Sequence, residues 1–350
     1  ECATLMQAPL ALFNGSYVGE RPTGIGVVAR ELAAALGPEE VSAVWPQGMT
    51  PDQGIAGHAR RLWWTQTQLP SLWRASGAPL LFSPLPEAPL FAGVPSVVLA
   101  HDLLPLRYPQ PTPLLPYHIT YVPLVLRRAR HVLCNSEATA REVHRRIGVP
   151  TRQLSVLKLG FNPGQLRPLG YARQPELLVL GRHNPHKNLR RLLEALAALR
   201  DQEHRIHFVG PQDRRYTPKL QLLAQELGVA SRCRWTAWVS NEERLELLNR
   251  ARALVIPSLW EGFGLPALEA MACGTPVLAS TAGALPEVVG ETAVPLNPLK
   301  PEQMAAAIDN FLRSNGLQQQ LAQKGPQRAA EFSWTLTSAE LKQRLRALSP

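Results

Sequence analysis

Short apolar runs alternate along the chain with longer segments in which apolar residues recur every three or four positions. The short runs predict buried strands, and the longer segments predict amphipathic helices. Repeated alternation of strand and helix is typical of a parallel, doubly wound sheet with helices on both faces. The expected strands are 10–14, 41–45, 80–83, 96–100, 131–136, 176–180, 205–209, 234–238, 253–258 and 276–279.

The segments with helical spacing carry signals for where helices begin. Ser136 suits an N-cap, and Ser240 with Glu243 three residues later forms a capping box. The expected helices are 25–36, 60–69, 137–147, 188–200, 218–227, 241–250, 267–273, 301–314, 316–332 and 333–348.

Two aromatic segments of the N-terminal half have more than one interpretation. Residues 114–130 run apolar and aromatic into a cluster of three arginines. This pattern suits an amphipathic segment lying on anionic lipid, but the prolines within it also suit a packed helix with a solvated basic end. We expect Trp63, Trp64 and Trp73 to fill a core, although an acceptor-lining or lipid-contacting role stays open.

The length of 350 residues predicts two domains, since one domain takes about 150 residues. Residues 163–174 are rich in Pro and Gly and poor in apolar side chains. We therefore expect an N-terminal domain over residues 1–162, a linker over 163–174 and a C-terminal domain over 175–333.

The charge favours anionic partners. Thirty-seven Lys and Arg against 27 Asp and Glu give a net charge of +10. An excess of this size suits nucleic acid, an acidic membrane surface or phosphorylated ligands. The sequence has no aromatic-basic RNA motif, helix-turn-helix pattern or zinc pattern, so nucleic acid lacks a supporting motif.

The cysteines and the hydropathy bear on the compartment. Four cysteines lie far apart with no Cys-x-x-Cys pair, which argues against a zinc site or a disulfide framework and suits a reducing cytoplasm. No apolar run reaches the ~18 residues of a membrane span, and the first residues lack the pattern of a signal peptide. We expect a cytoplasmic protein.

The clearest chemical motif is Glu261-Gly-Phe-Gly-Leu-Pro-Ala-Leu-Glu269, between an expected strand and an expected helix. Gly262 and Gly264 allow the backbone to pass close to another molecule. Amides at the start of a helix lack helical acceptors, so this turn predicts an anion site, most often for phosphate. The two carboxylates lie about one helical turn apart and can accept hydrogen bonds from hydroxyls in the same cavity. Such a site suits a sugar nucleotide.

Further candidates follow other expected strands. Arg182 and Lys187 come after strand 176–180 and can neutralise a diphosphate at the same sheet edge. His101 follows strand 96–100, where ligands bind in open α/β sheets. Gly24 and Gly26 lie where the first strand leads into the first helix, another place for an anionic or polar ligand.

Together these motifs resemble a known family. The Glu-x7-Glu signature, Gly181-Arg182-His-Asn-Pro-His-Lys187-Asn188, His101-Asp102-Leu103 and Gly24-Ile-Gly26 occur in the order and at the spacing of retaining family 4 glycosyltransferases. The resemblance covers nearly the whole chain. It implies the GT-B fold, in which two Rossmann-like, doubly wound domains face a cleft. It further implies that the N-terminal domain binds the acceptor, that the C-terminal domain binds the donor, and that residues 334–350 cross back to the first domain.

The resemblance also implies roles for single residues. Glu269 would bind the ribose hydroxyls, and Arg182 with Lys187 the diphosphate. His101 would contact the transferred sugar, and the glycines near the N-terminus would lie across the cleft from the donor phosphates. Sugar and phosphate would be held by Glu261 and the amides of Gly262, Phe263, Gly264 and Leu265, and the base by backbone near Gly210 and Val239. Two departures, Ala237 in place of Gly and Gly160-Phe-Asn162 in place of Gly-Val-Asp, fall in the base and linker regions.

The expected reaction is retaining transfer of a hexose, in which the leaving phosphate takes the proton of the acceptor hydroxyl. No Asp-x-Asp pair stands beside an expected strand end, so we expect no metal and no cofactor. Similarity to bacterial mannosyltransferases favours mannose from GDP-mannose over glucose from UDP-glucose. The acceptor would be a glycan or a lipid-linked sugar, with peripheral contact of the enzyme to an anionic membrane and no nucleic acid partner.

Other functions stay open. A sugar-nucleotide epimerase on the same fold would release an altered sugar without an acceptor. A phosphorylase would show a lysine for pyridoxal phosphate and a much longer chain. A non-catalytic nucleic-acid-binding protein would bind nucleic acid with no response to sugar nucleotides.

Overall fold

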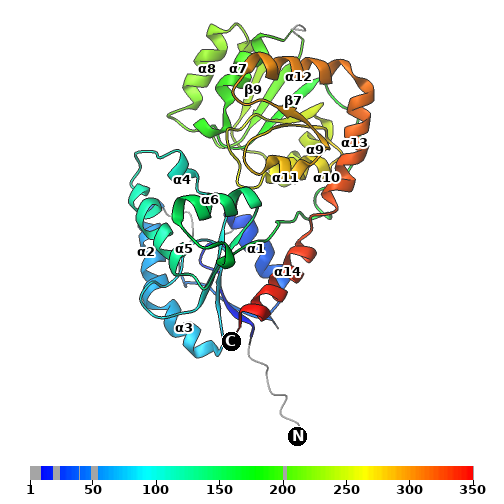
Figure 1. Cartoon of the computed structure of the whole chain (residues 1–350). Coiled ribbons are helices and arrows are strands. Elements are labelled where there is room, and N and C mark those ends of the chain that lie inside the picture. Colours follow the sequence, from blue (N-terminus) through cyan, green and yellow to red (C-terminus); the bar gives the residue numbers. More distant parts are fainter. Residues whose placement is uncertain (1–8, 19–23, 39, 49–53, 200–202, 350) are drawn as a thin grey trace. The chain divides into compact units, whose positions relative to one another are not determined.

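The computed structural model describes residues 9–18, 24–38, 40–48, 54–199 and 203–349, and the chain forms two compact units (Figure 1). The N-terminal unit comprises Glu1–Gly160 and Trp334–Pro350, and the C-terminal unit comprises Phe161–Ser333. The predicted organisation into two doubly wound α/β domains is confirmed, because each unit contains a six-stranded, fully parallel sheet flanked by helices.

The sheet of the N-terminal unit has the order β2-β1-β3-β4-β5-β6. The strands are β1 (Ala11–Asn14), β2 (Val41–Val44), β3 (Leu81–Ser83), β4 (Ser96–Ala100), β5 (His131–Cys134) and β6 (Leu154–Val156). The helices are α1 (Ile25–Leu36), α2 (Gly54–Thr67), α3 (Leu69–Ser76), α4 (Leu104–Arg107), η1 (Tyr117–Tyr121), α5 (Val122–Arg128), α6 (Glu137–Ile147), η2 (Thr151–Gln153) and α14 (Trp334–Leu348).

Strand β4 is buried in the core of the N-terminal unit. All five of its residues are buried, as expected for a parallel strand covered by helices on both faces. One face packs on α5 and α6 through a cluster that includes Val98, Val125 and Val143. The β-branched residues of β4 suit this environment, since they pack well on a pleated surface.

The last helix of the chain, α14, belongs to the N-terminal unit and lies beside α1, red beside blue in Figure 1. The Thr337 hydroxyl donates to the Lys158 carbonyl at 2.8 Å, and Arg344 Nη2 donates to the Val156 carbonyl at 3.1 Å. These bonds attach α14 to the end of the unit's edge strand β6.

The sheet of the C-terminal unit has the order β12-β11-β10-β7-β8-β9. The strands are β7 (Glu176–Leu180), β8 (Arg205–Val209), β9 (Cys233–Thr236), β10 (Ala253–Ile256), β11 (Val277–Ser280) and β12 (Ala293–Leu296). The helices are η3 (Pro185–Lys187), α7 (Leu189–Ala197), α8 (Thr217–Glu226), η4 (Ala230–Arg232), α9 (Asn241–Arg250), α10 (Leu265–Ala272), α11 (Leu285–Val289), α12 (Pro301–Arg313) and α13 (Asn315–Ala329).

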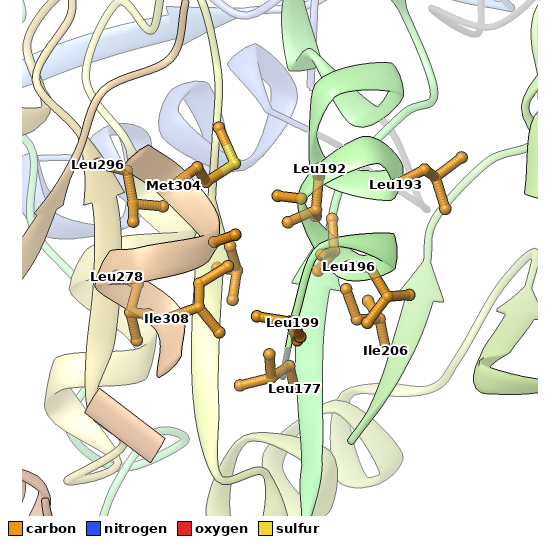
Figure 2. Close-up of a cluster of buried hydrophobic side chains, with 14 of the residues drawn as sticks. Leu177, Leu192, Leu193, Leu196, Leu199, Ile206, Leu278, Leu296, Met304 and Ile308 are labelled. Atoms are coloured by element: carbon orange, nitrogen blue, oxygen red, sulfur yellow. The ribbon is translucent and has the colours of Figure 1, made fainter. Parts of the chain in front are cut away.

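The core of this unit lies between the sheet and helices α7 and α12. Figure 2 shows Leu192 and Leu196 of α7 opposite Met304 and Ile308 of α12, with strand residues such as Leu278 beside them. The helical residues recur every three to four positions, so the periodicity seen in the sequence is the face that packs on the sheet.

Some local expectations were wrong or incomplete. The expected linker 163–174 falls inside the C-terminal unit, where the Leu169 amide donates to Asn249 and the Gln174 amide to the Arg250 carbonyl, each at 2.7 Å.

The tryptophans of α2 differ in their burial. Trp64 is buried as predicted, but Trp63 is 70% exposed, so the core assignment is wrong for Trp63.

Residues 114–130 form the π-helix η1 followed by α5, whose inner face packs on the core of the N-terminal unit. This is the packed-helix interpretation, although Ile119 and Leu124 stay exposed on the outer face. None of the helices in the described part of the chain combines the length and the apolar character that a membrane span requires.

Candidate functional site

The strand order of the C-terminal sheet reverses between the neighbouring strands β7 and β10. Strands β7, β8 and β9 follow one another to one side, and β10, β11 and β12 follow one another to the other side. In open parallel sheets, ligands bind at the carboxyl ends of the strands at such a switch point. The segments that follow β7 and β10 are the two that contain the candidate residues Lys187 and Glu261.

Lys187 and Glu261 meet at this switch point. Lys187 Nζ lies 2.7 Å from Glu261 Oε1, which also accepts a hydrogen bond from the Ser258 hydroxyl at 2.6 Å. Glu261 is 9% exposed. Burial alone would raise the pKa of Glu261, but Lys187, followed by the Ser258 hydroxyl, outweighs it and holds that pKa below its ordinary value. The carboxylate is therefore ionised at neutral pH.

Asn188 places Lys187 beside β10. It has a φ of 59°, which makes it the one described residue other than glycine in the left-handed region. Its side-chain amide donates to the carbonyls of Pro257 and Pro298, at 2.9 and 2.7 Å. Asn tolerates this backbone conformation better than most residues, and the two bonds fix η3 against the end of β10. Asn188 is therefore a structural part of the site, a role that its sequence motif does not predict.

The turn between Glu261 and α10 has the features of an anion site. The backbone amides of Phe263, Gly264 and Leu265 donate to no acceptor in the described part of the chain. Helix α10 begins at Leu265, with Gly264 as its N-cap and Pro266 as its second residue. Three free amides at the start of a helix suit a phosphate or a similar anion.

Gly264 and Phe263 are explained partly by packing. Gly264 has a φ of 106°, and a Cβ there would lie 2.7 Å from Leu285 Cδ2. The Phe263 side chain is buried and packs edge-on against Phe332, with ring centroids 6.0 Å apart. Only the backbone of Phe263 is thus available to a ligand.

The backbone of Glu261 is held from the β11 side. A Cβ on Gly283 would lie 2.6 Å from the Glu261 carbonyl oxygen and 2.8 Å from its nitrogen, and the Ala284 amide donates to that oxygen at 3.0 Å. The loop after β11 therefore fixes the backbone of Glu261. Sequence reasoning missed Gly283, because its partner is not near it in the sequence.

Glu269 lies one turn into α10 and pairs with Arg244 of α9. Arg244 Nη1 lies 3.1 Å from Glu269 Oε1 and 3.2 Å from Oε2. Burial raises the pKa of Glu269 above its ordinary value, and Arg244 offsets this only in part. Each oxygen keeps a lone pair for a ligand hydroxyl. Arg244 was not among the predicted site residues.

The strand ends next to Lys187 carry Arg182, Gly210 and Val239. A Cβ on Gly210 would lie 2.1 Å from the Gly181 carbonyl oxygen, so the loops after β7 and β8 touch through backbone. Arg182 is exposed and makes no hydrogen bond or ion pair within the described part of the chain. Val239 is half-buried, and the neighbouring Trp238 is 71% exposed.

The remaining candidates belong to the N-terminal unit. His101, 8% exposed, follows β4 and has its Nε2 2.7 Å from the Pro84 carbonyl oxygen. Burial lowers the pKa of His101 to about 4, and the bond to Pro84 opposes this only in part, so the ring is neutral. The Asp102 carboxylate accepts from the Leu104 amide at 2.9 Å and orders the loop. Gly24 precedes α1 with a φ of 52°, and Gly26 is buried in its first turn.

Two family models match the chain in succession. "Glycosyltransferase Family 4" matches residues 22–165, and "Glycosyl transferases group 1" matches residues 168–328. These ranges contain every candidate residue named above.

Curated relatives and a solved structure agree with these matches. The chain is 36% identical over 222 residues to the MMP alpha-(1->4)-mannosyltransferase of Mycolicibacterium hassiacum, covering 62% of this chain and 54% of that protein. It is 30% identical over 222 residues to the O-antigen chain mannosyltransferase B of Escherichia coli, covering 60% and 58%. The chain thus matches little more than half the length of these relatives. The fold resembles sucrose-phosphate synthase from Thermosynechococcus elongatus, with a TM-score of 0.77, 22% identity, and 98% and 99% of the two chains covered.

Proposed function

The chain belongs to the glycosyltransferases of group 1 and family 4, and from this premise we propose that it transfers a hexose from a nucleoside-diphosphate sugar with retention of configuration. The observation that carries the proposal is the switch point of the C-terminal sheet. A cation at Lys187, an ionised carboxylate at Glu261 and the free amides of Phe263, Gly264 and Leu265 are gathered there.

In this proposal, the free amides and Lys187 hold the donor diphosphate. Lys187 exchanges the Glu261 carboxylate for phosphate oxygens, and Arg182 adds a second cation from the same loop. Glu261, held by Ser258, then accepts from the sugar hydroxyls. These groups stabilise negative charge as the nucleotide leaves, and the departing phosphate takes the acceptor proton, so no metal is required.

The other predicted contacts complete the donor site. Glu269, oriented by Arg244, accepts from the ribose hydroxyls, and the backbone near Gly210 and Val239 binds the base. For His101 we propose a contact with the transferred sugar, and for Gly24 and Gly26 a role in binding the donor.

We propose mannose as the sugar and GDP-mannose as the donor, with UDP-glucose the next choice. The two curated relatives named above are a mannosyltransferase for MMP and an O-antigen chain mannosyltransferase, which supports mannose and a glycan or lipid-linked acceptor. We further propose that the enzyme works in the cytoplasm, at the surface of an anionic membrane.

The membrane contact would use an arginine-aromatic face, defined by Trp63, Phe91, Ile119, Leu124 and Arg128. The four apolar side chains are 70, 85, 49 and 41% exposed, in that order. Arg128 Cζ lies 5.4 Å from the centroid of the Phe91 ring. Exposed aromatics beside arginines suit the headgroup region of anionic lipid.

The charge of the segment that carries this face supports the same partner. Residues 54–130 contain seven arginines and no lysine, against two acids, Glu87 and Asp102. Glu87 is fully buried and pairs with the buried Arg61, so six arginines against Asp102 set the charge of the rest of the segment.

The experiment that tests the function combines binding with turnover. A thermal-shift series with GDP, UDP and ADP at one common concentration should raise the Tm most for one base, since a nucleotide at ~100 times its Kd adds about 2.7 kcal/mol to native-state stability. Transfer of labelled mannose from GDP-mannose to lipid-linked acceptors should follow. Stabilisation by no nucleoside diphosphate would overturn the proposal, and release of an altered free sugar without an acceptor would indicate an epimerase.

A further inference from the structure

The hydrogen bond to Pro84 determines which nitrogen of His101 carries the proton. A carbonyl oxygen only accepts, so Nε2, at 2.7 Å from it, must be the donor. Because the buried ring is neutral, Nδ1 is left without a hydrogen. Nδ1 bonds to no group in the described part of the chain. It is therefore available to accept from a ligand hydroxyl.

The Pro84 carbonyl lies in a segment without helix or strand, residues 84–95, that joins β3 to β4. Without regular hydrogen bonds, such a segment needs side chains to fix it. The first anchor precedes it, since Asn14 Nδ2 donates to the Ser83 hydroxyl at 3.1 Å.

The second anchor is the buried carboxylate of Glu87. Arg61 of α2 donates to both of its oxygens, from Nε at 2.9 Å and from Nη2 at 2.8 Å. The Tyr117 hydroxyl of η1 donates to the same carboxylate at 2.8 Å. Glu87 is fully buried and the Arg61 side chain is 6% exposed. Burying such a pair is costly, and a neutral apolar pair often serves stability as well or better.

The third anchor is the next residue, Ala88. Its carbonyl accepts from Gln66 of α2 at 3.0 Å and from the Tyr121 hydroxyl at 2.9 Å. Helices α2 and η1 thus hold the segment by side chains at two successive residues. The π-helical form of η1 accompanies this arrangement, and π-helical turns are frequent near functional sites.

We infer that the Arg61–Glu87 ion pair is a positioning pair: it fixes the Pro84 carbonyl, and thereby presents the bare Nδ1 of His101 to a hydroxyl of the transferred sugar. The role of His101 toward the sugar rests on the proposed function. The tautomer of His101 does not depend on that function and can be measured in the protein alone.

The test compares the intact native chain with Arg61→Met/Glu87→Gln, which removes both charges and leaves no buried charge unpaired. Tyr117→Phe is the second variant, since it removes one hydroxyl and keeps the ion pair. In histidine labelled with ¹⁵N, long-range proton–nitrogen correlation spectra distinguish a protonated from a bare ring nitrogen. His101→Gln assigns the signals.

The native ring should show a protonated Nε2 and a bare Nδ1, and the double variant should show a mixture of the two tautomers. With GDP-mannose, the double variant should lose about tenfold in kcat, with a donor KM within about threefold of native. Tyr117→Phe should change the His101 tautomer and kcat in the same direction as the double variant does, but by a smaller amount.

Arg107→Met/Glu142→Gln is the matched control, because this ion pair of the same unit also has a buried carboxylate, 4% exposed, and joins α4 to α6. It should leave the His101 signals unchanged. A native tautomer retained in both test variants would overturn the inference, as would an equal tautomer change in the control. If the native chain transfers no sugar, the proposed function fails, and the spectra alone decide whether the pair sets the tautomer.

Discussion

Lys187 and Glu261 were assigned to different parts of the donor, yet they bind one another at 2.7 Å. Replacing one leaves the other partly buried and unpaired, so a single substitution affects stability as well as binding. We expect Lys187→Met and Glu261→Gln each to lower kcat/KM by at least ~100-fold, the scale of a lost preorganised charge contact. Steady-state kinetics with GDP-mannose measures this.

The double variant Lys187→Met/Glu261→Gln is the control for stability. Its Tm should exceed that of the less stable single variant, since no charge is left unpaired, while activity stays low. Folded single variants with near-native turnover would remove the pair from the site.

The bare Nδ1 of His101 leads to a prediction that separates two conservative substitutions. Asn can place its amide oxygen near the position of Nδ1, whereas Gln can place its amide nitrogen near that of Nε2. If the ring accepts from the sugar, His101→Asn should retain about tenfold more kcat than His101→Gln. The comparison is of kcat at saturating donor, and the reverse order would show that His101 donates instead.

At the scale of single residues, those within the motifs could be predicted from the sequence, but the residues that hold them in position could not. Lys187, Glu261 and Glu269 stand in a compact pattern with a chemical meaning. Asn188 acts through carbonyls 69 and 110 positions away along the chain, and no local pattern shows such distances. Arg244 has the sequence context of a solvated charge on a helix, and only its contact with Glu269 places it at the site.

Among the elements, the loop after β11 offers a sharp test, because Gly283 and Gly228 differ only in their surroundings. Both have a positive φ, 66° and 70°, but a Cβ on Gly283 would strike the backbone of Glu261, whereas one on Gly228 meets nothing within 4 Å. Each change to Ala should cost about 1–2 kcal/mol through backbone strain. Gly283→Ala should also weaken donor binding about tenfold, measured by calorimetry, because Glu261 must move.

Gly228→Ala should leave donor affinity unchanged. Equal affinities for the two variants would mean that the loop after β11 does not position Glu261.

The arginine-aromatic face, whose residues come from α2, segment 84–95, η1 and α5, leads to a second prediction at this scale. Phe91→Ser/Leu124→Ser should reduce co-sedimentation with phosphatidylglycerol vesicles by more than about fivefold, since it removes apolar area that would enter the headgroup region. Raising salt should also release the native protein, because arginine–lipid attraction is screened.

Leu222→Ser in α8 is the control, because this residue is 55% exposed but lies in the other unit. Equal binding of native chain and Phe91→Ser/Leu124→Ser, or equal binding to neutral phosphatidylcholine, would refute the membrane contact.

Most elements with clear periodicity were predicted within a few residues, but the expected helix 60–69 is two helices, α2 and α3, and strands β6 and β12 and helix α11 were not predicted. Strand β12 at the sheet edge is half-exposed and contains Pro295, which is tolerated at an edge but breaks the apolar pattern. Helix α11 has five residues, too few to show a helical period.

For the whole molecule, alternation of strands and helices was sufficient for two doubly wound domains, because that pattern admits few other folds. The boundary was harder. Residues 163–174 have linker composition, but their backbone bonds to α9, so composition alone does not distinguish a linker from a loop packed on a domain.

Acid stability is a property of the whole chain, since His101 in one unit and His186 in the other both have pKa values lowered by burial to about 4, from an ordinary 6.5. As pH falls below 6.5, the unfolded chain binds protons at these sites and the folded chain does not until about pH 4. The free energy of unfolding contributed by each histidine is thus intact above 6.5 and falls by about 3 kcal/mol by pH 4. The low pKa of Glu261 lowers the free energy of unfolding only at still lower pH, and the raised pKa of Glu269 acts in the opposite direction.

Urea unfolding from pH 7.5 to 5 should therefore show stability decreasing with acid. His101→Asn should reduce the slope of the free energy of unfolding against pH by up to about 1.4 kcal/mol per pH unit in the N-terminal unit's transition. An unchanged slope in that variant would mean that His101 is protonated in the folded protein, and a charged ring cannot offer a bare Nδ1 to the sugar.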